Sequence, residues 1–179
     1  MKQSQLAINS VSTIRFGIEE CLPAYRAAGF RNVEFPLEHV RRYLAQGHTV
    51  AEVQHLLADN DLHCIGGFDC VVECFSAPES RARNQARILE NARLLAELGG
   101  ANLVVGTDGP ADLAQVADPI GEMADVFAQV ADSIAETGVS LCIEANWSPL
   151  VKSLRTAAAI AQRASRPNLG IVFDPAHYH

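Results

Sequence analysis

The sequence predicts an α/β fold, an incomplete (β/α)8 TIM barrel with about six βα modules and parallel strands. Strand-like apolar runs and helical segments alternate six times along the chain, and such unbroken alternation is typical of a parallel sheet. The phosphate-binding signatures of nucleotide-binding sheets are missing, which favours a barrel over an open sheet. A polar group also stands at or just beyond the end of every predicted strand, as at a barrel rim. These groups are Asn9 or Ser10, Glu34, Asp69, Thr107 or Asp108, Glu144 and Asp174.

The first half of the chain carries three predicted modules. Thr49 and Glu52 have the spacing of a capping box, which predicts a helix start there. Gly66 and Gly67 permit a neighbouring strand or a ligand to approach the third strand closely. The predicted strands are Leu6–Ser12, Asn32–Phe35 and Leu62–Phe68, and the predicted helices are Ile18–Ala28, one opening at Thr49, and Pro78–Leu98. A polar connection is expected between the second strand and Thr49.

The second half carries three more strands with a helix between consecutive ones. Asp118 before Pro119 and Ser148 before Pro149 each combine an N-cap residue with a proline in the first helical turn. Gly138 ends the first of these two helices. The predicted strands lie at Asn102–Gly106, within Val139–Trp147, and at Gly170–Phe173.

Length and composition restrict the class of protein. The 179 residues, 49% of them apolar, suffice for one sizeable core and most simply form a single domain over residues 1–179. The formal charge of −7 excludes the basic footprint of a nucleic-acid binder, and no apolar run approaches the roughly 20 residues that cross a bilayer. The first residues lack the apolar core of a signal peptide, and five cysteines, an odd number, indicate reduced thiols. We therefore expect a cytoplasmic protein with no membrane or nucleic-acid partner.

The segment Val139–His179 carries the candidate site. Its two strand runs are apolar on both faces and are joined by a helix, which predicts neighbouring parallel strands in a buried sheet. Glu144 ends the first run, and Asp174 with His177 ends the second. Two carboxylates and an imidazole at the C-terminal rim of a sheet form half of a divalent-metal site.

Two segments here, L-C-I-E-A-N-W-S-P and G-I-V-F-D-P-A-H, resemble the fifth and sixth strands of the xylose-isomerase-like barrels. More narrowly, they resemble the sugar phosphate isomerase/epimerase family, and so do the segments A-G-F-R-N-V-E-F and A-E-L-G-G-A-N-L-V-V. The resemblance implies that Glu144 and Asp174 bind one divalent cation and that His177 contacts a substrate hydroxyl or carbonyl oxygen. It also implies a histidine and a glutamate from strands seven and eight, which six modules do not include. We therefore expect a fragment of a barrel, truncated after strand six, that lacks two metal ligands.

The chemistry expected of this site is proton transfer between adjacent carbons of a sugar or sugar phosphate through an enediolate. A divalent cation, Mn²⁺, Mg²⁺, Co²⁺ or Zn²⁺, would polarise the substrate oxygens. Glu144 is the candidate catalytic base alongside its role as a ligand, and His177 is the second candidate catalytic residue. Further candidates for contact with the substrate are Trp147, Glu34, Asp69 and Asp108.

Two alternatives remain at this point. The first is another chemistry on the same barrel, either dehydration of a keto-inositol or hydrolysis at an abasic DNA site. The DNA reaction is disfavoured because the expected strands two and three end in Glu34-Phe35-Pro36 and Asp69-Cys70 without additional histidines. The second is a non-catalytic half-barrel that acts as an interaction module. Unpaired edges of the first and sixth strands also predict self-association, and thus a homo-oligomer.

Overall fold

The computed structural model describes residues 5–146 and 148–175. The strands are β1 (Ala7–Asn9), β2 (Asn32–Pro36), β3 (His63–Val72), β4 (Asn102–Thr107), β5 (Ser140–Glu144) and β6 (Leu169–Val172). The α-helices are α1 (Ile18–Ala27), α2 (Leu37–Leu44), α3 (Val50–Asp59), α4 (Pro78–Glu97), α5 (Pro119–Ile134) and α6 (Leu154–Ala164). Short 3-10 turns are η2 (Ser10–Thr13), η3 (Leu113–Gln115) and η4 (Ala135–Thr137).

The strands lie in one six-stranded sheet in the order β1-β2-β3-β4-β5-β6. Each pair β1–β2, β2–β3 and β5–β6 is parallel, and at least one helix separates every two consecutive strands along the chain. The predicted alternation of strands and helices is therefore confirmed. The order of the strands in the sheet is the same as their order along the chain. This is the arrangement of a barrel rather than of a doubly wound open sheet.

Three local predictions are corrected. The segment after β2, predicted as a polar connection, is helix α2, which buries Leu37, Val40 and Tyr43 at helical spacing. Strand β3 extends to Val72 instead of ending near Phe68. Helix α6 begins at Leu154, with Ser153 as its N-cap, rather than at Ser148–Pro149.

The chain forms two compact units, and the first comprises Met1–Asp69 with Leu94–Asn102. The side chains of its core that are fully buried include Leu22, Val33, Phe35, Leu37, Val40 and Val53. Asn9 of β1 pairs in register with Glu34 of β2, and Glu34 pairs with Gly66 of β3. A Cβ atom at Gly67 would lie 2.5 Å from the carbonyl oxygen of Phe35, so glycine lets β2 approach β3 closely, as predicted.

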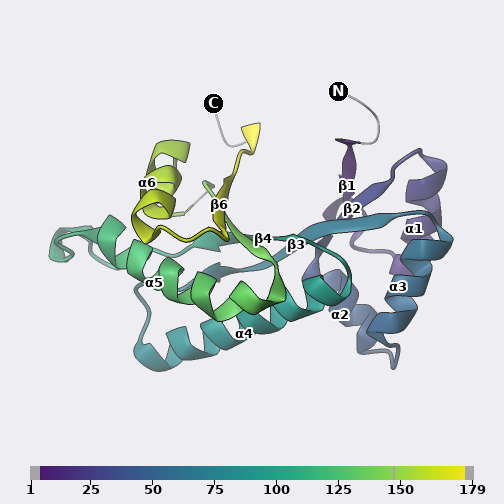
Figure 1. Ribbon diagram of the computed structural model, residues 1–179, viewed down its shortest axis with the longest axis horizontal. Coiled ribbons are helices and arrows are strands. Elements are labelled where there is room, and N and C mark those ends of the chain that lie inside the picture. Colours follow the sequence, from purple (N-terminus) through teal and green to yellow (C-terminus); the bar gives the residue numbers. More distant parts are fainter. Residues whose placement is uncertain (1–4, 147, 176–179) are drawn as a thin grey trace. The chain divides into compact units, whose positions relative to one another are not determined.

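The second unit comprises Cys70–Arg93 with Leu103–His179. Strands β5 and β6 pair in register from Leu141 opposite Leu169 to Glu144 opposite Val172. Helices α5 and α6 lie side by side (Figure 1). Two ion pairs connect them: Arg163 of α6 with Asp118, the N-cap of α5, and Arg166, just after α6, with Asp132 of α5. Asp118 also accepts a hydrogen bond from the Gly121 N–H, which confirms it as the N-cap ahead of Pro119. Within the described residues, no helix combines the length and the apolar character needed to cross a bilayer.

Candidate functional site

Glu144 and Asp174 lie near the C-terminal ends of adjacent parallel strands in the second unit. Glu144 is the last residue of β5, and its register partner on β6 is Val172. Asp174 follows two positions after Val172, which places it just beyond the same end of the sheet. Both side chains are partly exposed to solvent.

Asn146 makes a hydrogen bond that directs the Glu144 carboxylate. Its Nδ2 donates to Oε2 of Glu144 at 3.0 Å, while its Oδ1 accepts from the Ser148 N–H at 3.2 Å. The sequence interpretation missed this residue, although its position two after Glu144 is the signal that places both side chains on one face of an extended segment.

The loop after β5 is held by a buried hydroxyl pair. Oγ of Ser148 lies 2.5 Å from Oγ1 of Thr107 at the end of β4, and it accepts from the Val151 N–H at 3.2 Å. Both hydroxyl residues are buried, with exposed fractions of 4% each. Ser148 therefore stabilises a turn inside this loop instead of starting helix α6, which is the physical reason for the corrected helix boundary.

The predicted contact residues Glu34 and Asp69 lie in the first unit, and both have protein partners. Asn9 donates from Nδ2 to Oε2 of Glu34 at 2.7 Å across the β1–β2 pair. Asp69 forms an ion pair with Arg41 of α2 at 3.3 Å, and only 8% of the Asp69 side chain is exposed. These contacts hold both carboxylates in place within strands β2 and β3. Contact with a substrate remains a prediction for each.

Asp108 has a structural function at the loop after β3. Its Oδ1 accepts from the Cys74 N–H at 2.8 Å, and its Oδ2 accepts from the Phe75 N–H at 3.0 Å. The carboxylate thus satisfies two consecutive backbone donors of a loop that has no strand partner there. A contact between Asp108 and a substrate stays a prediction.

Two of the predicted site residues, Trp147 and His177, lie outside the described residues. Among residues 5–146 and 148–175, no three histidine, cysteine, aspartate or glutamate side chains gather in a group that could hold a metal ion. Glu144 and Asp174 therefore supply at most a partial ligand set within this part of the chain.

His39 is a buried neutral histidine whose two ring nitrogens are both hydrogen bonded. The Phe16 carbonyl oxygen can only accept, so Nε2 donates to it at 2.9 Å, and Nδ1 then accepts from the Ser10 hydroxyl at 3.1 Å. Burial lowers the pKa of His39 below its usual value. The side chain is 1% exposed, which makes it part of the core of the first unit and not a reactive group.

The cysteines are free thiols, and Cys64 and Cys74 are two of the three that are buried. Burial raises the pKa of Cys64 to about 11 and raises the pKa of Cys74 further. A thiol protonated at neutral pH is a poor nucleophile and a poor metal ligand. The absence of a zinc-ribbon spacing among Cys64, Cys70 and Cys74 agrees with this chemistry.

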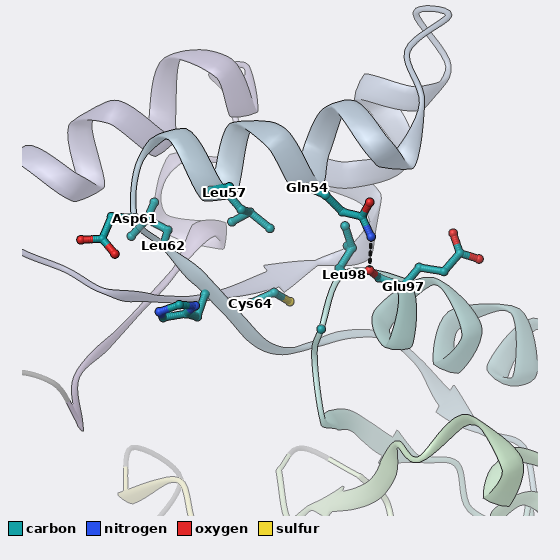
Figure 2. A pocket seen from close by; sticks show the side chains of 10 residues that line it. Gln54, Leu57, Asp61, Leu62, Cys64, Glu97 and Leu98 are labelled. Carbon is teal, nitrogen blue, oxygen red and sulfur yellow. Dashed lines mark hydrogen bonds between the residues drawn. The ribbon is translucent and has the colours of Figure 1, made fainter.

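A hollow of about 400 Å³ lies in the first unit (Figure 2). Across it, the Gln54 side chain of α3 donates to the carbonyl oxygen of Glu97 at the end of α4. The hollow includes His63, the first residue of β3, whereas the candidate carboxylate Asp69 lies toward the other end of that strand. Its lining residues are Gln54, Leu57, Ala58, Asp61, Leu62, His63, Cys64, Glu97, Leu98 and Gly99.

Comparison with solved structures identifies the fold. An IOLI protein with a bound zinc atom superposes with a TM-score of 0.79 at 16% identity, covering 97% of this chain and 63% of that one. An L-ribulose 3-epimerase superposes with a TM-score of 0.75 at 21% identity, covering 96% and 61%. A probable 3-DHS dehydratase, AsbF from Bacillus anthracis, gives 0.77 at 15% identity, covering 96% and 63%. The chain thus spans less than two thirds of the length of these structures, and at such identities the likeness establishes the fold alone.

No curated protein matches the sequence. The family model described as xylose isomerase-like TIM barrel matches residues 22–179, which is most of the chain. The six parallel strands therefore form part of a (β/α)8 barrel, as predicted. The chain belongs to the xylose isomerase-like TIM barrel family.

Proposed function

We propose that the barrel to which these six modules belong is a metal-dependent sugar or sugar-phosphate isomerase or epimerase. The single observation that carries the proposal is the pair of carboxylates, Glu144 and Asp174, at the same end of adjacent parallel strands β5 and β6. The family match and the likeness to an epimerase support this class of reaction. Because the solved relatives are longer than this chain, the activity is proposed for a complete barrel.

The donor set fits a divalent cation. Glu144 and Asp174 would hold it. These oxygen ligands, together with the imidazole of the histidine expected from strand seven, suit Mn²⁺, Mg²⁺, Co²⁺ or Zn²⁺. When bound, the cation supplies Lewis acidity toward neighbouring substrate oxygens. With two of the four ligands expected of the family, the 179-residue chain alone is expected to bind Mn²⁺ weakly and to show little turnover.

Glu144 has the chemistry of a general base. A carboxylate oxygen of Glu144 accepts the proton from the substrate carbon, which leaves an enediolate, and in an isomerisation returns it to the neighbouring carbon. In an epimerisation, the glutamate expected on strand eight would donate a proton from the opposite face, while Glu144 keeps the one it accepted. His177 would hold a substrate hydroxyl or carbonyl oxygen, and Trp147 would stack on the sugar ring. Glu34, Asp69 and Asp108 remain proposed polar contacts, and a cytoplasmic location and a homo-oligomer remain predictions.

The test is hydrogen exchange between ²H₂O and a panel of ketoses, aldoses and their phosphates with Mn²⁺ and the complete protein. The Glu144→Gln variant should lower kcat about 10²–10⁴-fold with little change in KM, because the amide keeps the size of the side chain but cannot accept a proton. Glu136→Gln, an exposed residue of η4, is the matched control and should behave as wild type. Unchanged exchange in Glu144→Gln would reject the proposal, and release of water in place of exchange would favour the dehydratase alternative.

A further inference from the structure

We propose that Asn146 is a positioning residue that fixes the orientation of the Glu144 carboxylate, an inference that rests on the proposed function of Glu144. The amide of Asn146 has two ends, and each contacts a different group. Nδ2 donates to Oε2 of Glu144 at 3.0 Å, and Oδ1 accepts from the Ser148 N–H at 3.2 Å.

The orientation of the amide follows from its partners. The Ser148 N–H can only donate, so the oxygen of Asn146 must face it. The amino group of Asn146 then faces Glu144, whose carboxylate oxygens accept. The two hydrogen bonds therefore support one arrangement of the side chain and exclude the flipped one.

Ser148, which anchors Asn146, is itself held by a second hydrogen bond. Ser148 is buried, and its hydroxyl group lies 2.5 Å from that of Thr107, so the backbone that holds Asn146 is tied to the end of β4. A Cβ atom at Gly106 of β4 would lie 3.5 Å from Nδ2 of Asn146 and 3.1 Å from Cγ1 of Val71. The amide of Asn146 therefore lies beside β4 and reaches Glu144 from there.

A carboxylate held in this way meets a cation or a substrate without first losing rotational freedom. Hydrogen-bond partners of metal-binding carboxylates typically change affinity or activity by 10–100-fold when they are removed. In this arrangement Asn146 acts through its hydrogen bond to Glu144.

The test compares Asn146→Ala with Asn84→Ala in the complete protein, using Mn²⁺ affinity from calorimetry, turnover and melting temperature. Asn84 is a matched control because its side chain also donates once, to the Val71 carbonyl, and accepts once, from the Glu73 N–H. Asn146→Ala should weaken Mn²⁺ binding about tenfold, whereas Asn84→Ala should keep wild-type affinity even if its melting temperature falls.

A third variant separates the turn from the positioning role. Asn146→Asp retains the oxygen that accepts from Ser148 but replaces the donor to Glu144 with a carboxylate oxygen. It should keep the wild-type melting temperature within about 3 °C and lose at least tenfold in turnover.

Three results would overturn the inference. They are wild-type Mn²⁺ affinity and turnover in Asn146→Ala, an equal loss of affinity in Asn84→Ala, and full turnover in Asn146→Asp. Glu144→Gln, measured in parallel, distinguishes the two failures. If it abolishes turnover while Asn146→Ala does not, the positioning role fails and the proposed function stands. If Glu144→Gln itself is harmless, both fail.

Discussion

Replacing Asp108 should destabilise the protein measurably, because its carboxylate is the acceptor for two consecutive loop N–H groups. The bonds from Cys74 and Phe75 are 2.8 Å and 3.0 Å long, and the Cys74 side of the loop is buried. A hydrogen bond to a charged group contributes about 1.5–3 kcal/mol, and partial exposure at the loop reduces this. The two bonds together should contribute about 2–4 kcal/mol to the free energy of unfolding.

The assay is thermal unfolding followed by circular dichroism for Asp108→Ala and Asp108→Asn. For a protein of this size, about 2–4 kcal/mol corresponds to a fall in melting temperature of roughly 4–16 °C. Asp108→Asn should not rescue stability, because its amino group faces an N–H donor. Asp125→Asn, which removes the same charge from an exposed site on α5, should stay within about 0.5 kcal/mol of wild type. Wild-type melting in both Asp108 variants, combined with a raised KM, would refute the structural role and indicate contact with the substrate.

Two further changes test the packing of the first unit. Burial lowers the pKa of His39 in the folded protein, so the unfolded chain binds a proton more readily than the folded one. The free energy of unfolding should therefore fall as the pH drops below about 6.5. In His39→Gln that dependence should be weaker, and an identical pH profile in melting experiments would contradict the assignment. Gly67→Ala should cost about 1–3 kcal/mol because its Cβ would lie 2.5 Å from the Phe35 carbonyl oxygen. Gly170→Ala, where no atom lies within 4 Å of the added Cβ, is the control, and equal melting temperatures for the two variants would show that β2 and β3 are not closely packed.

Local signals in the sequence predicted much of the fold correctly. Thr49 with Glu52 forms the predicted capping box, and Asp118 caps α5 ahead of Pro119. These signals work because both partners lie within one helical turn, where backbone geometry alone brings them together. A local signal also places Glu144 near the end of its strand, because an apolar run and the polar residue that ends it are neighbours in the sequence.

Helix α2 shows why some local structure escaped prediction. Its residues include one histidine and several charged residues, which suggested a solvated connection. In the folded chain, Ser10 and the Phe16 carbonyl, both distant in sequence, satisfy the His39 ring, so a polar side chain can be buried at helical spacing beside Val40. The burial of His39 depends on hydrogen-bond partners that lie more than twenty residues away in the sequence, so a local sequence pattern cannot predict it.

The sequence by itself determined the succession of strands and helices, the family, and the presence of carboxylates at strand ends. Only the tertiary structure decided what those carboxylates contact. Asp69 pairs with Arg41, Asp108 accepts from a loop more than thirty residues away, and Glu144 is directed by Asn146, whose anchor depends on Thr107. The physical reason is that strand pattern depends on neighbours along the chain, whereas a hydrogen-bond partner is chosen by distance in space, which only the pairing of strands and the course of their loops establish.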